Sequence, residues 1–206
     1  RGLGDVYKRQ IDDAVIQRTV QALSERNMPT VVAETGEHAL QLLKNMIPEG
    51  SEVFNSTSET LDTIGYSDYL RNNPRYRNLH DEVAAETDPV KLREKRRLAT
   101  VTEYIIGSVQ AISETGEIVV ASGSGSQLGA FVFGAKYVIL VVGTQKICPT
   151  LSDAIDRTRG YTLDRHDEWL QAQGRGARPV GKLAILENEV GEGRVRVILI
   201  KQNLGW

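Results

Sequence analysis

Four hydroxyl-bearing residues, Ser56, Thr57, Ser58 and Thr60, gather at the start of a helical stretch in the segment FNSTSETLDTIG. Hydroxyls and free backbone N–H groups at the start of a helix can hold a carboxylate or a phosphate. The alternative is that Ser56 or Ser58 only caps the helix, but a cap needs one hydroxyl and this loop supplies four. We therefore predict a site for a small anion here, formed by Ser56, Ser58, Glu59 and Thr60.

A second segment, ASGSGSQLGAF, alternates glycine with serine before another short helical stretch. Glycine lets the backbone approach an anion closely, although this spacing is neither that of a P-loop nor that of a dinucleotide fingerprint. Lys146 of GTQKI is a candidate counter-charge for the same anion. The residues expected to join the site from this segment are Gly123, Ser124, Gly125, Ser126 and Gln127.

The third candidate is Glu114 in AISETGEIVV, at a turn between two predicted strands and close to Gly116, which we include in the candidate site. A carboxylate there can act as a nucleophile, as a general base or only as an exposed turn residue, and the spacing alone favours the turn residue. The three histidines have no spacing typical of a triad or a metal site, so no metal is predicted. The single cysteine, Cys148, excludes an intrachain disulfide and favours an unreactive thiol over a nucleophile.

These segments need a scaffold, and helices alternate with strands from residue 11 onward, which favours a mostly parallel sheet flanked by helices. Each candidate loop follows a predicted strand, where ligands bind in open α/β sheets. The run KLREKRR favours a solvated helix face over a substrate-binding one. The predicted helices are 11–26, 36–46, 61–70, a charged helix to about 102, 128–133 and 151–159, and the predicted strands are 30–33, 52–54, 104–109, 117–121, 136–142, 182–187 and 194–200. The last two strands are expected to form a C-terminal β-hairpin through EVGEG.

Residues 1–10, RGLGDVYKRQ, match the translation of the end of a transposon-based sequencing adapter, codon by codon. We therefore expect this segment to be adapter sequence, with the domain spanning 11–206 and native residues missing before Ile11. Val6 and Tyr7 should then stay out of the core. The segment holds three basic residues and one acidic residue, so removing it changes 25 Lys and Arg against 27 Asp and Glu into 22 against 26, a net charge of −4.

This mild acidity argues against a nucleic-acid partner, which requires a concentrated basic surface. A length of 206 residues suits one domain. No apolar run approaches the roughly 18 residues of a membrane span. We expect a soluble, cytoplasmic protein that does not bind membranes, and homo-oligomerisation stays open.

Four segments occur in the order AISETGEIV, ASGSGSQLGAFVFGAKYVILVVGTQKI, TLSDAIDR and GRVRVILIKQNLGW. Together they resemble the LUD-domain family, the LutC-like lactate-utilisation proteins of bacteria and archaea, and STSETLDTIG is similar to the family's Ser-x-Thr-Leu…Gly segment. The resemblance covers 11–206. It implies a single α/β domain similar to the sugar-phosphate isomerase and CoA-transferase type of fold. It also implies an accessory role beside iron–sulfur subunits that oxidise L-lactate, or a related organic acid. One cysteine cannot hold a four-cysteine cluster, so any cluster belongs to a partner and no cofactor is expected in this chain.

One further resemblance supports an alternative function. Class I CoA transferases carry a nucleophilic glutamate in a Ser-Glu-Asn-Gly turn, and the segment Ser113-Glu114-Thr115-Gly116 differs from it at one position. The alternative is therefore an enzyme that acts on an acyl-CoA or a phosphorylated metabolite through Glu114 as nucleophile or base. A third possibility is a domain whose surface only organises partner subunits. The leading hypothesis is an accessory subunit that binds a small anionic metabolite.

Overall fold

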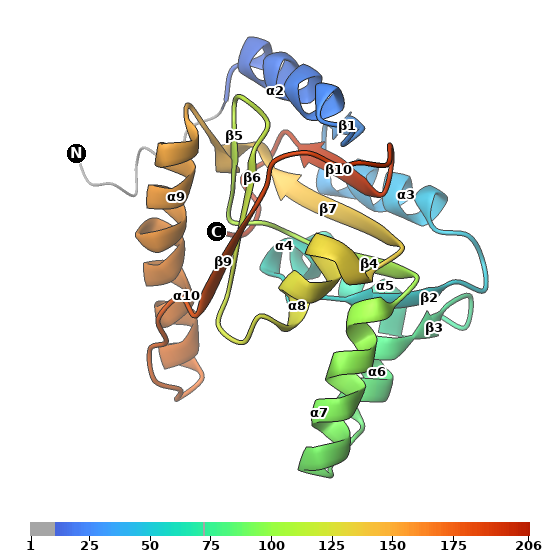
Figure 1. The fold of residues 1–206 in the computed structure, drawn as a ribbon. Helices are drawn as coiled ribbons and strands as arrows, with labels where there is room; N and C mark the ends of the chain where they lie inside the picture. Colours follow the sequence, from blue (N-terminus) through green and yellow to red (C-terminus); the bar gives the residue numbers. More distant parts are fainter. Residues whose placement is uncertain (1–10, 72) are drawn as a thin grey trace.

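Six strands form one sheet in which every pair of neighbours is parallel (Figure 1). The computed structural model describes residues 11–71 and 73–206, so the expectations for residues 1–10, Val6 and Tyr7 among them, lie outside the described residues. The central strands YVILVVG and VRVILI are almost entirely apolar, because both of their faces are covered. In spatial order the strands are β1 (Thr30–Ala33), β10 (Val195–Ile200), β7 (Tyr137–Gly143), β4 (Tyr104–Gly107), β2 (Glu52–Asn55) and β3 (Arg77–Asn78).

A second sheet of four strands runs in the order β8 (Ile147–Cys148), β5 (Ala111–Ser113), β6 (Ile118–Ser122) and β9 (Lys182–Leu186). The predicted C-terminal β-hairpin is wrong, because β9 pairs with β6 in this sheet while β10 belongs to the large sheet. The EVGEG connection crosses between the sheets instead of turning back. It is held at the end of the first helix, where the Glu189 N–H donates to the Arg26 carbonyl at 3.0 Å.

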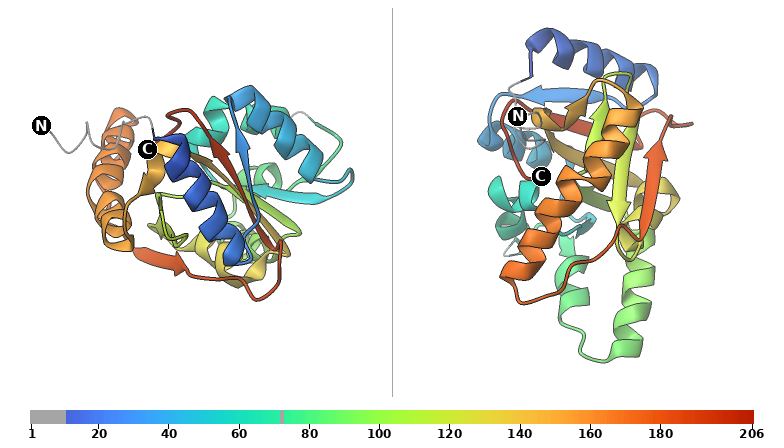
Figure 2. Two further views of the ribbon diagram at one scale, coloured as in Figure 1. Left: turned by 90° about the horizontal axis from the view of Figure 1, so that it is seen from above. Right: turned by 90° about the vertical axis from the view of Figure 1, so that its left-hand side faces the viewer.

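The two sheets pack face to face, and alternation along β7 shows how. Val138 and Leu140 face the core between the sheets, whereas Ile139 and Val141 face the helices on the other side. The helices complete the layers on both sides (Figure 2). The outer face of the large sheet is covered by α3 (Gly36–Met46), α4 (Glu59–Thr63) and α5 (Tyr66–Arg71). The small sheet is covered by α9 (Leu151–Arg159), against which α10 (Tyr161–Ala172) packs, and α2 (Asp13–Glu25) contributes Ile16 and Leu23 to the core between the sheets.

Local signals account for several element boundaries. Thr150 and Asp153 form the capping box that starts α9. The predicted helix 61–70 is interrupted at Gly65, whose φ of +78° is left-handed, and this separates α4 from α5. The predicted charged helix is also divided, because Pro89 starts a new helix after its cap Asp88. The resulting helices are α6 (Leu79–Ala84) and α7 (Pro89–Leu98), which project from the body of the domain (Figure 1).

Several elements were missed in the sequence, the short strands β3 and β8 among them. The segment AISETG contains the strand β5 as well as a turn, and the 12-residue helix α10 follows α9 directly at Gly160. The predicted helix 128–133 is a short helix, α8 (Ser126–Gly129), followed by a π-helical turn at Ala130–Gly134. Throughout 11–71 and 73–206, no helix combines the length and the apolar character needed to cross a membrane.

Candidate functional site

A cleft of about 840 Å³ opens at the carboxyl ends of the parallel strands, within the size range of small-molecule sites. Ser56 follows β2, Ser108 follows β4 and Lys146 follows β7, and all three line it. The chain after β10 returns to the same place, where Gly205 and Trp206 contribute to the wall. Parallel strands bring these segments together because their carboxyl ends share one edge of the sheet.

Lys146 lies at the bottom of the cleft with only 2% of its surface exposed. Its Nζ donates hydrogen bonds to Thr60 Oγ1 at 3.3 Å and to Ser108 Oγ at 3.2 Å. Burial, and to a smaller extent the nearby Arg157 guanidinium, lower the pKa of Lys146 to about 7, while Glu59 opposes the shift. The amine is therefore divided between its charged and neutral forms near neutral pH.

The C-terminal segment packs against the side chains beside this lysine. Thr60 Oγ1 donates to the Leu204 carbonyl at 3.2 Å, and Gln145 Nε2 donates to the same carbonyl at 2.9 Å. Gly205 has a φ of +65°, and a Cβ at this position would lie 2.6 Å from Thr60 Oγ1. Glycine is required both by the backbone conformation and by this contact.

The loop hydroxyls line the cleft and also stabilise their own loops. Ser58 Oγ accepts from the Leu61 N–H at 3.4 Å and caps α4, as the capping alternative predicted. Ser124 Oγ lies 3.1 Å from Ser126 Oγ and accepts from the Ser126 N–H at 3.3 Å. Because α4 has five residues and α8 has four, neither has a full helix dipole to attract an anion. Any attraction has to come from hydroxyls and side-chain cations.

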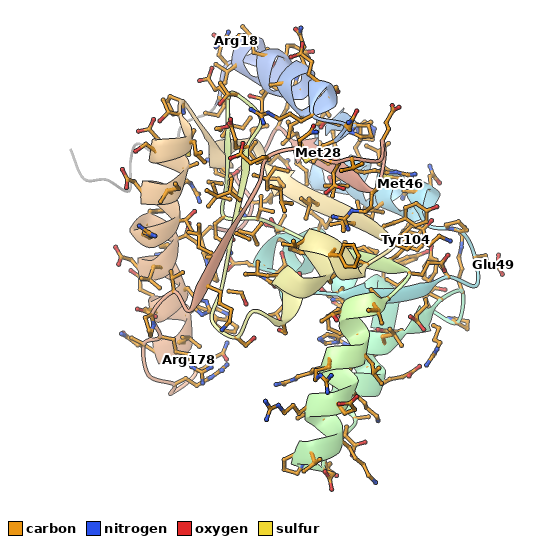
Figure 3. The ribbon with its side chains drawn as sticks, viewed as in Figure 1. Arg18, Met28, Met46, Glu49, Tyr104 and Arg178 are labelled. Atoms are coloured by element: carbon orange, nitrogen blue, oxygen red, sulfur yellow. The ribbon has the colours of Figure 1, made fainter. Side chains whose placement is uncertain are left out.

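Three arginines line the cleft with Lys146: Arg96 from α7, and Arg175 and Arg178 from the loop after α10. Figure 3 shows Arg178 at the end of the molecule where α10 gives way to this loop. No residue of α7 is buried, so the KLREKRR run forms a solvated face as expected, with Arg96 also reaching the cleft. Glu59 is the acidic member of the predicted set that lines the cleft, and its pKa is raised by burial.

One wall of the cleft comes from α10, which was not predicted. His166 stacks on Trp169 with ring centroids 5.7 Å apart, and Trp169 contacts Trp206 at 6.5 Å. Burial lowers the pKa of His166. A signal was present in the sequence, because Leu163, His166 and Leu170 recur with helical spacing on one face and all three line the cleft.

Nine of the eleven predicted ligand-binding residues line this single cleft, whereas the other two and the predicted catalytic residue do not. Gly125 lies in the same loop with a φ of +85°, where it shapes the turn. The nine that come together are Ser56, Ser58, Glu59, Thr60, Gly123, Ser124, Ser126, Gln127 and Lys146.

Glu114 and Gly116 lie in the turn between β5 and β6, outside the cleft lining. Glu114 Oε2 accepts from Arg18 Nη2 at 2.9 Å, and Arg18 lies at the opposite end of the molecule from Arg178 (Figure 3). Gly116 has a φ of +93°, and a Cβ there would lie 3.0 Å from the Ala22 backbone. Glu114 and Gly116 therefore belong to a turn that packs on α2.

Cys148 is the single cysteine of the chain, and its surroundings are apolar and closed. The thiol is buried, and burial raises its pKa to about 11, as for an unreactive cysteine. Among the described residues, no three His, Cys, Asp or Glu side chains come together in a geometry that could hold a metal ion.

The fold and the cleft define a two-sheet α/β protein with a ligand-sized site at the carboxyl ends of its parallel strands. A sequence profile of the LUD domain matches residues 16–200, so the chain belongs to the LUD-domain family. This membership associates it with lactate utilisation in general terms. No curated protein sequence matches the chain.

A solved structure of another protein resembles the fold. A DUF162 family protein from Deinococcus radiodurans matches with a TM-score of 0.54 and 11% identity, covering 91% of this chain and 97% of that one. It supports the single α/β domain with a mostly parallel sheet flanked by helices. The eIF2B beta structure from Chaetomium thermophilum matches with a TM-score of 0.37 and 16% identity, covering 60% of this chain and 45% of that one.

Proposed function

We propose that this chain is a LutC-like protein that binds a small anionic metabolite in the cleft and serves as an accessory subunit in the use of L-lactate or a related organic acid. One observation carries the proposal. Loops that are far apart in the sequence, and that were predicted to bind an anion because of their hydroxyls, glycines and lysine, line one cleft of ligand size. Family membership supports the general area of metabolism.

The cleft has suitable groups for a carboxylate or a phosphate. Arg96, Arg175 and Arg178 supply guanidinium groups, whose planar set of N–H donors matches a carboxylate or a phosphate. The Ser58 oxygen accepts from the Leu61 N–H and the Ser124 oxygen accepts from the Ser126 N–H, so the hydroxyl hydrogens of both serines can be donated to an anion. Guanidinium groups together with several hydroxyl donors suit a compact anion better than a neutral ligand.

Electron transfer in this scheme belongs to partner subunits. The single cysteine leaves this chain without the ligands of a four-cysteine cluster, so iron–sulfur proteins encoded beside it would carry the redox centres in the cytoplasm. Co-expression with the neighbouring iron–sulfur reading frames, followed by size-exclusion chromatography, should give a complex. Separate elution of all components would contradict the accessory role.

Calorimetry tests the binding site. L-lactate, pyruvate and a sugar phosphate are titrated into the wild-type protein and into a double variant with Ser58→Ala and Ser124→Ala. We expect at least one of the three to bind at millimolar concentration, and the double variant to bind it several-fold more weakly. Ser24→Ala on the exposed face of α2 is the matched control and should bind normally.

The cap at Ser58 needs a separate control, because losing it destabilises α4 by about 1 kcal/mol. Ser58→Asn keeps a capping oxygen and removes the hydroxyl. If it restores stability but not binding, the hydroxyl itself contacts the ligand. If the wild-type protein binds none of the three anions, the proposed site is wrong.

A further inference from the structure

We propose that Lys146 is a nucleophile that forms an imine with a small anionic aldehyde or 2-oxo acid bound in the cleft. The inference rests on the proposed function and deepens it, since it names a carbonyl group as a required feature of the ligand. It assigns a covalent role to a residue that was predicted only as a counter-charge.

The hydrogen-bonding environment of Lys146 suits a neutral amine. A neutral amine has two N–H donors and one lone pair, whereas an ammonium group has three donors. The structure provides two hydroxyl acceptors, Thr60 Oγ1 and Ser108 Oγ. The hydroxyl hydrogen of Thr60 is already used, because it is donated to the Leu204 carbonyl. These two acceptors match the neutral amine and leave its lone pair available.

The surroundings of Lys146 also disfavour the charged form of its amine. Among the residues that the structure describes, no carboxylate forms an ion pair with Lys146, although the side chain is buried. The charged groups that act on it are Arg157 from α9, which disfavours its protonation, and Glu59 from α4, which favours it. Together with burial, they lower the pKa of Lys146 to about 7. Lysines desolvated beside another cation are the ones that act as nucleophiles near neutral pH.

A ligand bound in the cleft can reach the amine of Lys146. Lys146 lines the cleft floor, and the arginines lie around the same space. A carboxylate or phosphate bound to an arginine or to the loop hydroxyls can therefore bring an adjacent carbonyl carbon toward the amine. An exposed lysine such as Lys201 lacks this environment, because Asp13 and Glu34 hold its ammonium group and raise its pKa.

The proposed step balances without a further reactant. The lone pair of Lys146 Nζ attacks the carbonyl carbon, and the carbonyl π electrons move to oxygen, which takes up a proton to give a carbinolamine. Over the two steps the nitrogen gives up both of its protons and the oxygen takes up both, so that water leaves as the C=N bond forms and the products are one imine and one water. Thr60 and Ser108, already hydrogen-bonded to Nζ, are placed to relay these protons.

Reductive trapping tests the proposal. The full chain is incubated with pyruvate or glyoxylate and sodium cyanoborohydride, which reduces an imine to a stable secondary amine. Peptide mass mapping then locates the adduct. We expect a saturable adduct on the peptide that contains Lys146, absent in Lys146→Met. Lys182→Met is the matched control, because Lys182 is exposed and its side chain lies beside the Gly125 loop.

The pH dependence supplies a second readout. The rate of trapping at Lys146 should rise about tenfold per pH unit below the pKa of the amine and level off above it, with the change of slope near pH 7. If Lys146→Met does not fold, the peptide map of the wild-type protein still decides the question. No adduct, or labelling no greater than at Lys182, overturns the proposal.

The two proposals fail in different ways. L-lactate carries a hydroxyl where pyruvate carries its carbonyl, so it can occupy an anion site but cannot form an imine. Calorimetric binding of L-lactate or pyruvate without a trapped adduct overturns the imine and leaves the proposed anion site intact. Absence of both binding and adduct overturns both proposals.

Discussion

Replacing Lys146 by methionine should change how the stability of the protein depends on pH. Methionine has a similar length and no titratable group, so the variant removes the proton-binding site and keeps most of the buried volume. In the wild-type protein, the pKa of Lys146 falls from 10.5 to about 7 on folding. The unfolded chain therefore binds more protons than the folded protein above pH 7, and the stability of the wild type rises with pH in that window.

The magnitude follows from the two pKa values. One pKa unit corresponds to about 1.4 kcal/mol, and at pH 7 the folded lysine is already half deprotonated. Between about pH 7 and about pH 9, the free energy of unfolding of the wild type should rise by about 2 kcal/mol relative to the variant. The lost hydrogen bonds to Thr60 and Ser108 add an offset that is nearly independent of pH.

Urea denaturation of both proteins, at several pH values across this window, measures the difference directly. Lys201→Met is the control, because the pKa of Lys201 is raised by Asp13 and Glu34 and the group stays protonated in both states. Its difference from the wild type should stay constant. A difference between wild type and Lys146→Met that does not change from about pH 7 to about pH 9 would refute the account of Lys146 as a desolvated amine.

Three further substitutions test other parts of the structure. Gly205→Ala should lower the free energy of unfolding by about 1–3 kcal/mol in urea denaturation, because it combines a left-handed φ with a close approach to Thr60; Gly50→Ala, with a similar φ and open space around it, should cost less. Leu140→Ala in the core between the sheets should lower it by about 2–5 kcal/mol, and a loss below about 1 kcal/mol would contradict the packing. Glu114→Gln should leave anion binding unchanged in calorimetry, whereas a large loss would return Glu114 to the site.

Much of the fold could be predicted because the relevant signals are local. The apolar run of β7 and the capping box of α9 each depend on neighbouring residues. The pairing of β9 could not be predicted in this way. Its sequence and the following EVGEG are compatible with a hairpin, and only the position of β6 and the anchoring of Glu189 on Arg26 decide the outcome.

The candidate site could likewise be predicted only in part. Loops that follow parallel strands must meet at one edge of the sheet, so the convergence of the Ser58 and Ser124 loops followed from the element order. The burial of Lys146 could not be predicted from the element order, because it depends on the C-terminal segment returning to pack on Thr60. Glu114 was considered through a four-residue similarity, and such a similarity can reflect the turn alone, here one with Gly116 at positive φ.

The most direct test of the anion site is a titration of the ¹⁵N-labelled protein with L-lactate and with pyruvate, followed through the backbone amide resonances. The account predicts saturable shifts concentrated at 56–60, 122–127 and Lys146, with the amides around Glu114 unaffected. Shifts concentrated at the Glu114 turn, or no shifts with either compound, would contradict it.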